Sequence, residues 1–123
     1  MKAMIVDDSG FIRGFLRTLL EARGVVCVEA ENGKAALDMV SAPAAFDVAL
    51  VDVNMPVMNG LEFVKALRSN PAHSSMKVVM VTTEADHAFI EAALGFGADE
   101  YLMKPFDEES LLEKLQMAGL ELA

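Results

Sequence analysis

Four short apolar runs of this sequence end at residues suited to phosphoryl and metal chemistry. Asp7 and Asp8 follow the first run, and Asp52, Thr82 and Lys104 follow three later ones. Three carboxylates in one pocket repel each other, which favours a bound divalent cation, Mg²⁺ or Mn²⁺, with oxygen ligands. A carboxylate can attack phosphorus to form an aspartyl phosphate, and a lysine and a cation can neutralise the phosphoryl oxygens. The set lacks a general base for attack by water, which argues against a fast hydrolase.

The elements that must position these residues alternate between two kinds. Short continuous apolar runs predict strands buried on both faces, as in parallel sheets. These runs are Ala3–Val6, Val25–Val28, Val48–Val51, Val78–Val81 and, more weakly, Tyr101–Met103.

The segments between the runs have helical spacing, which predicts five helices with one buried face each. Ser9 and Asp107 are the predicted N-caps, and Gly24 and Gly95 the predicted stop signals. The residues expected to face inward are Ile12, Phe15, Leu16 and Leu19, then Ala36, Leu37 and Val40, then Leu61, Val64 and Leu67, then Phe89, Ile90, Ala93 and Leu94, and finally Leu111, Leu112, Leu115 and Ala118.

This fivefold alternation predicts an α/β fold, a (βα)5 flavodoxin-like doubly wound parallel sheet with helices on both faces. We expect one domain over residues 1–123. Ligands of such folds bind beyond the carboxyl ends of the strands. The second run ends at Glu29 and Ala30 and offers nothing obvious to the site. A strand order of 2-1-3-4-5 would explain this, because it places the second strand at an edge.

Composition limits the partners and the compartment. Acidic residues outnumber basic ones 19 to 10, for a net charge of −9. This balance argues against direct nucleic-acid binding. The single cysteine, Cys27, lies in an apolar run, which predicts a buried and inert thiol. The sequence shows no signal-peptide core and no apolar stretch near the ~20 residues of a membrane span, so we expect a cytoplasmic protein without membrane insertion.

Four motifs occur in order along the chain. They are Asp7-Asp8-Ser9, Asp52-Val53-Asn54-Met55-Pro56 with Gly60, Val81-Thr82-Thr83-Glu84-Ala85, and Tyr101-Leu102-Met103-Lys104-Pro105-Phe106. With them the sequence resembles response-regulator receiver domains of two-component systems over its whole length, most closely the stand-alone CheY-like regulators. The order 2-1-3-4-5 is already known for CheY, so it is not an independent result.

The resemblance implies a role for each acidic residue. Asp52 would be the phosphoacceptor. Asp8 and Asp52 would bind Mg²⁺ directly, together with the backbone carbonyl of Asn54. Asp7 would act mainly through metal-bound water.

The resemblance also implies how the phosphoryl group is held and sensed. Lys104 would contact it, with a cis peptide bond to Pro105, and Thr82 and Thr83 would contact it as well. Thr82 and Tyr101 would form the switch pair.

The lifetime of the phosphoryl group would depend on Asn54 and Glu84, which border the path of an attacking water. These residue types imply a lifetime of seconds or minutes. Thr83 is larger than the alanine of CheY and could hinder this path.

The implied partners are a sensor histidine kinase or phosphotransfer protein and a downstream protein. The downstream partner would bind the face of the fourth helix, fifth strand and fifth helix, which includes Ala85, Tyr101, Met103 and Lys114. We expect a monomer, with dimerisation on phosphorylation as the alternative. The chain would act alone, with chemotaxis one candidate pathway, or as the receiver of a larger regulator. It would catalyse only its own phosphorylation and dephosphorylation.

Three other interpretations compete. A haloacid-dehalogenase phosphatase needs a second aspartate two residues after the first, where this chain has Asn54. A flavodoxin needs a Ser/Thr/Gly-rich loop where this chain has Asp7-Asp8-Ser9-Gly10. A pseudo-receiver would lack the acidic triad. We expect His73 and His87 to be surface residues, neither metal ligands nor phosphodonors.

Overall fold

The computed structural model describes residues 1–40, 46–83 and 87–122. Within these ranges one parallel sheet of five strands runs in the order β2-β1-β3-β4-β5. This confirms the predicted fold class and strand order. The strands are β1 (Lys2–Val6), β2 (Val26–Ala30), β3 (Val48–Asp52), β4 (Lys77–Thr82) and β5 (Glu100–Met103).

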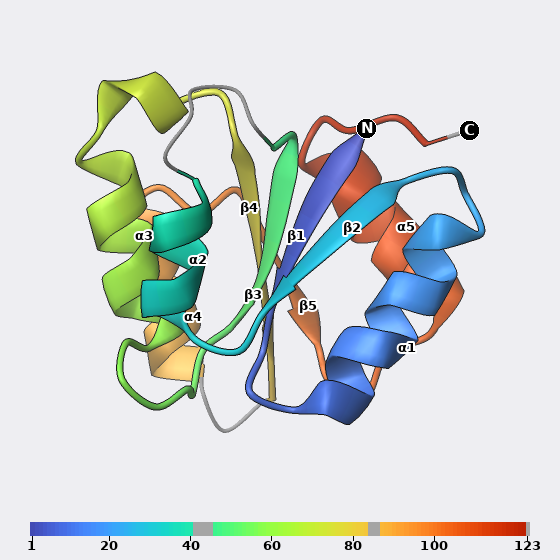
Figure 1. The fold of residues 1–123 in the computed structure, drawn as a ribbon, viewed down its shortest axis with the longest axis horizontal. Coiled ribbons are helices and arrows are strands. Elements are labelled where there is room, and N and C mark those ends of the chain that lie inside the picture. Colours follow the sequence, from blue (N-terminus) through green and yellow to red (C-terminus); the bar gives the residue numbers. More distant parts are fainter. Residues whose placement is uncertain (41–45, 84–86, 123) are drawn as a thin grey trace.

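Helices cover both faces of the sheet (Figure 1). On one face lie α1 (Gly10–Glu21) and α5 (Glu108–Met117), and on the other lie α2 (Gly33–Met39), α3 (Gly60–Arg68) and α4 (His87–Gly95). A short 3₁₀ turn, η1 (Pro71–His73), precedes β4. No helix in the described ranges is long and apolar enough to cross a membrane.

One apolar core lies on each face of the sheet, because alternate residues of a strand point to opposite faces. In β1, Met4 and Val6 belong to the core under α2, α3 and α4, whereas Ala3 and Ile5 belong to the core under α1 and α5. Burial on both faces explains why the strands are continuous apolar runs.

Helix ends follow the predicted signals with one difference. Ser9 and Asp107 are N-caps whose side chains accept backbone N–H groups of α1 and α5. Gly24 has a φ of 79°, in the left-handed region that ends helices. Helix α4 does end at Gly95, but the left-handed residue is Gly97, with a φ of 114°.

Three residues predicted to face inward are exposed instead: Phe15 on α1, and Phe89 and Leu94 on α4. The core also includes residues outside the predicted faces, such as Leu20 on α1 and Phe63 on α3. Helical spacing predicts which residues lie at the middle of a buried helix face. The three exposed residues lie at the margins of these faces. The Phe15 ring packs at 5.5 Å from the ring of Phe106.

The histidine prediction is half wrong. His87 is exposed as expected, whereas His73 is buried in η1. Its backbone carbonyl accepts a hydrogen bond from Arg68 at 2.9 Å, which holds this turn against α3. Cys27 is buried, and burial raises the pKa of its thiol, as expected for an inert cysteine.

Candidate functional site

The predicted site residues gather where the strands end. Asp52 and Thr82 are the last residues of β3 and β4, while Asp7 and Lys104 directly follow β1 and β5. The strands are parallel and in register, so these ends lie along one edge of the sheet, at the bottom of Figure 1. The edge strand β2 lies beyond β1 and, among the described residues, adds no carboxylate to the acidic cluster.

Three carboxylates form the acidic cluster. One oxygen from each of Asp7, Asp8 and Asp52 lies within 4.8 Å of the others. Asp7 and Asp52 are only 2 % and 7 % exposed, whereas Asp8 is exposed. Hard divalent cations prefer oxygen ligands with part of the shell left to water, so this donor set fits Mg²⁺.

Lys104 supplies a positive charge inside the cluster. Its Nζ lies 3.2 Å from Asp7 Oδ2 and 3.3 Å from Asp52 Oδ1. Burial lowers the pKa of Lys104, but the charges of Asp52 and Asp7 outweigh this and raise it, so the ammonium stays protonated. The peptide bond between Lys104 and Pro105 is cis, as the resemblance implies.

The Asp52 carboxylate ionises less readily than an ordinary aspartate in the protein without metal. Burial, together with the charges of Asp7 and Asp8, raises the pKa of Asp52 to about 6, although Lys104 opposes the rise. A second cation in the cluster would act in the same direction as Lys104. Metal binding and ionisation of the Asp52 carboxylate should therefore favour each other.

A close approach of two backbones fixes the position of Asp52. A Cβ atom on Gly60, the first residue of α3, would overlap the carbonyl oxygen of Asp52. The Gly60 N–H donates to the Val53 carbonyl at 2.9 Å, which closes the loop between β3 and α3. Asn54, whose carbonyl is a predicted metal ligand, is exposed in this loop.

The predicted switch residues lie on the neighbouring strands β4 and β5. Thr82 is fully buried, and its hydroxyl donates to the Thr83 carbonyl at 3.3 Å. Tyr101 is half-buried on the neighbouring strand β5, and Thr83 is exposed. Glu84 and Ala85 lie outside the described residues.

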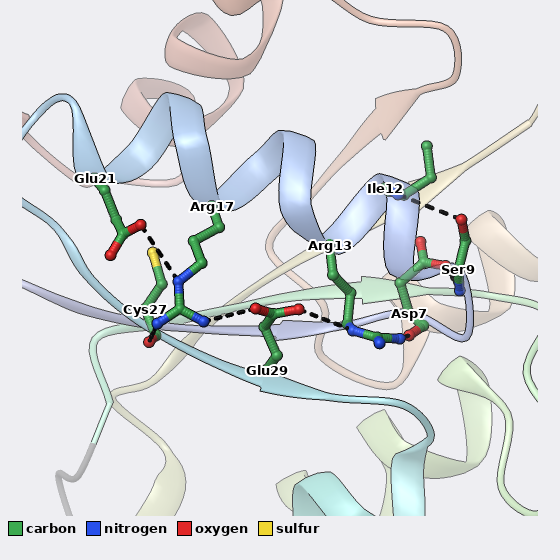
Figure 2. A network of polar contacts seen from close by, with 8 residues as sticks. All are labelled: Asp7, Ser9, Ile12, Arg13, Arg17, Glu21, Cys27 and Glu29. Atoms are coloured by element: carbon green, nitrogen blue, oxygen red, sulfur yellow. Dashed lines mark hydrogen bonds and ion pairs between the residues drawn. The ribbon is translucent and has the colours of Figure 1, made fainter.

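The sequence prediction missed the contribution of the second strand. Glu29 on β2 binds Arg13 and Arg17 of α1, and Arg13 also contacts the backbone of Asp7 (Figure 2). The signal was the spacing of Arg13, Arg17 and Glu21, which lie one turn apart on a single helix face.

Comparison with known proteins points in one direction. The family model of the response regulator receiver domain matches residues 3–116. A chemotaxis protein CheY homolog of Campylobacter jejuni is 40 % identical over 117 residues, covering 94 % of this chain and 90 % of that protein. The chemotaxis protein CheY1 of Helicobacter pylori is 39 % identical and covers 95 % of both chains.

Solved structures agree. The chemotaxis response regulator CheY4 of Vibrio cholerae matches with a TM-score of 0.86 and 39 % identity, covering 95 % of this chain and 97 % of that one. This match covers nearly the whole of both chains, so it favours the receiver assignment over the flavodoxin and haloacid-dehalogenase interpretations. The chain belongs to the response regulator receiver domain family, the receiving module of two-component signalling.

Proposed function

We propose that this chain accepts a phosphoryl group on Asp52 from a sensor histidine kinase or phosphotransfer protein, with Mg²⁺ bound at Asp8, Asp52 and the Asn54 carbonyl. Asp7 would reach the metal through water. The observation that carries the proposal is the position of the Lys104 ammonium, within 3.3 Å of both buried carboxylates. A purely structural ion pair would need one carboxylate, not three.

The chemical step is a displacement at phosphorus. An oxygen of ionised Asp52 forms a bond to phosphorus while the bond to the donor nitrogen or oxygen breaks, and the donor keeps that electron pair. Lys104, Thr82 and Thr83 contact the phosphoryl oxygens and hold them in line. Bound Mg²⁺ supplies further neutralisation of the charge on those oxygens.

Phosphorylation by acetyl phosphate tests the acceptor. Wild-type protein should gain one phosphoryl group by intact mass, only with Mg²⁺ or Mn²⁺, in a linkage labile to alkali and hydroxylamine. Asp52→Asn should gain none. Asp38→Asn is the matched control, because Asp38 is exposed on α2 and pairs with Lys34 at 3.5 Å. Labelling of Asp52→Asn at the wild-type rate and stoichiometry would exclude Asp52.

The output surface is the second part of the proposal. Phosphate on Asp52 draws the Thr82 hydroxyl toward it, which opens space that the Tyr101 ring can fill by turning inward. The changed face comprises α4, β5 and α5, with Tyr101, Met103 and Lys114, and a downstream protein binds there. We expect phosphorylation to strengthen that binding by about 1–3 kcal/mol. Thr82→Ala should accept phosphate without this gain, and Tyr101→Ala should bind poorly in both states.

The phosphoryl group should be short-lived. The resemblance implies this from the residue types of Asn54 and Glu84, and the larger Thr83 should narrow the path of an attacking water. We expect decay within seconds or minutes after the donor is removed, as measured by intact mass. Decay lasting many hours would contradict this assignment, and Thr83→Ala should hasten the decay.

A further inference from the structure

A ladder of charged side chains joins the edge strand to the acidic cluster (Figure 2). The Glu29 carboxylate on β2 accepts a hydrogen bond from Arg13 Nε at 3.0 Å and one from Arg17 Nη1 at 2.6 Å. Arg17 also pairs with Glu21 at 3.3 Å. The two arginines thus share one anionic partner, one helical turn apart on α1.

The two arginines differ in the backbone carbonyl that each one reaches. Arg13 Nη1 donates to the carbonyl oxygen of Asp7 at 2.5 Å, whereas Arg17 Nη2 donates to that of Cys27 at 3.2 Å. Cys27 lies within β2, far along the strand from the site. The Asp7 carbonyl, in contrast, belongs to the peptide that joins Asp7 to Asp8.

The hydrogen bond from Arg13 to the Asp7 carbonyl oxygen also restricts the position of Asp8. A peptide unit is planar, so the position of the Asp7 carbonyl also sets the nitrogen and Cα of Asp8. The other side of Asp7 is held already: its N–H donates to the Ala30 carbonyl at 3.1 Å, and its Oδ1 accepts the Ser9 N–H at 2.8 Å. The Asp8 side chain is exposed, so its direction depends on the backbone that carries it.

We propose that Arg13 is a positioning residue for the metal site. It holds the Asp7–Asp8 peptide so that the Asp8 carboxylate faces Asp52, and Glu29 holds the guanidinium of Arg13 in turn. The role is geometric, because the charge of Arg13 is offset by Glu29. The proposal rests on the proposed Mg²⁺ site.

The alternative is that both arginines only tie α1 to β2. In that case they act in the same way, since each one binds Glu29 and one carbonyl, and Arg17 differs by its added pair with Glu21. Arg17 is therefore a matched control for Arg13, with the same residue type, the same helix face and the same partner. Only Arg13, of these two arginines, touches the backbone of the acidic cluster.

The test compares Arg13→Gln with Arg17→Gln in calorimetric titrations with Mg²⁺, and needs no phosphorylation. Arg13→Gln should raise the Kd for Mg²⁺ about tenfold, the usual scale for losing a group that orients a metal ligand. Arg17→Gln should stay within about twofold of wild type, within the span of an exposed ion pair. Melting temperatures in EDTA report the structural loss of each variant separately. An unchanged Kd in Arg13→Gln, or an equal rise in both variants, overturns the proposal.

Two further variants keep the outcomes distinct. Arg13→Lys retains the charge but lacks the planar fork that serves Glu29 and Asp7 together, so its Kd should lie between those of wild type and Arg13→Gln. If Arg13→Gln does not fold, a wild-type Kd in Arg13→Lys overturns the proposal. Asp8→Ala tests the metal site itself: if it binds Mg²⁺ like wild type, the site assignment fails, whereas loss in Asp8→Ala with none in Arg13→Gln rejects only the positioning role.

Discussion

The ammonium group of Lys114 lies 4.4 Å from the centre of the Tyr101 ring. The same ammonium pairs with Glu100 at 3.5 Å, so it is held above the ring by a neighbour of Tyr101 on β5. A cation over an aromatic face stabilises that arrangement by about 0.5–1 kcal/mol at exposed sites. The proposed inward turn of Tyr101 gives up this contact, so Lys114 should favour the unphosphorylated position of the ring.

Fluorescence can follow this ring directly, because the chain has one tyrosine and no tryptophan. Mg²⁺ with beryllofluoride, an acyl-phosphate mimic, should protect Tyr101 from acrylamide quenching as the ring turns inward. Thr82→Ala should remove this protection. Equal quenching of wild type with and without the mimic would contradict a switch through Tyr101.

Lys114→Met should shift the ring inward without any phosphate. Losing the cation–π contact corresponds to a change of about two- to fivefold in the ratio of the two ring positions. Quenching of the unphosphorylated variant should therefore fall below that of wild type. Lys65→Met is the control, since Lys65 lies 4.8 Å from the ring of Phe96 and not near Tyr101.

The raised pKa of Asp52 predicts how stability depends on pH without metal. The pKa is about 6 in the fold, against an ordinary value of 3.8. Between these values the folded state keeps a proton that the unfolded state releases. The free energy of unfolding should therefore fall as pH rises from about 4 to about 6, by up to about 3 kcal/mol, and this contribution should level off above that.

Urea unfolding in EDTA at several pH values measures this effect as the difference between wild type and Asp52→Asn. The amide introduced by this substitution cannot ionise, so the variant should be the more stable protein at neutral pH and the difference should shrink toward about pH 4. Glu29 and Asp107, whose pKa values are lowered by hydrogen bonds, act in the opposite sense below that range and cancel in the difference. A constant difference from about pH 4 to about pH 8 would refute the raised pKa.

Repulsion among the carboxylates of Asp7, Asp8 and Asp52 should destabilise the fold, and bound Mg²⁺ should stabilise it. At free Mg²⁺ about 100 times its Kd, the wild-type fold gains about 2.7 kcal/mol by linkage. Asp8→Ala should melt higher than wild type in EDTA, because one repelling charge is gone, yet gain little from Mg²⁺. Asp38→Ala should behave like wild type in both conditions. Thermal melts with and without Mg²⁺ check both signs, and an undiminished Mg²⁺ shift in Asp8→Ala would argue against direct coordination.

Much of the fold could be predicted because its strongest signals are local. Continuous apolar runs mark strands covered on both faces, and Ser9 and Asp107 cap helices through contacts within one turn. The clustering of Asp7, Asp52 and Lys104 could be predicted because the carboxyl ends of parallel strands lie along one edge of the sheet. The burial of residues at the margins of the helix faces was predicted wrongly, as Phe15 and Phe89 show. Their burial depends on how each helix is rotated against the sheet.

The contact between Arg13 and Glu29 could not be predicted for a similar reason. Glu29 lies 16 residues from Arg13, and the contact requires α1 to lie along the edge strand with a particular rotation. His73 is a related case: it was expected at the surface, but Arg68 donates to its backbone carbonyl and holds that turn against α3. Both contacts are made by long arginine side chains, whose reach is not visible in hydrophobic spacing.

A strained residue in the loop after the acceptor gives the last prediction. Val57 has a φ of 69°, and the Met58 N–H donates to the Pro56 carbonyl at 2.7 Å across it, which closes a γ-turn. A β-branched residue rarely adopts this conformation, and the Val57 side chain is 79 % exposed, so little packing compensates.

Asparagine adopts a positive φ more readily than a β-branched residue does, so Val57→Asn should raise the free energy of unfolding by roughly 1 kcal/mol, seen as a rise of a few degrees in melting temperature. Val57→Ala is the control: it removes the branch but keeps Cβ, so most of the strain remains and the gain should be smaller. The Met58 carbonyl accepts the Gly33 N–H at 3.1 Å, and this anchor should keep the loop in place. Mg²⁺ affinity should therefore not change in either variant. A lower melting temperature for Val57→Asn than for wild type would show that the valine side chain stabilises this loop through contacts that outweigh its strain.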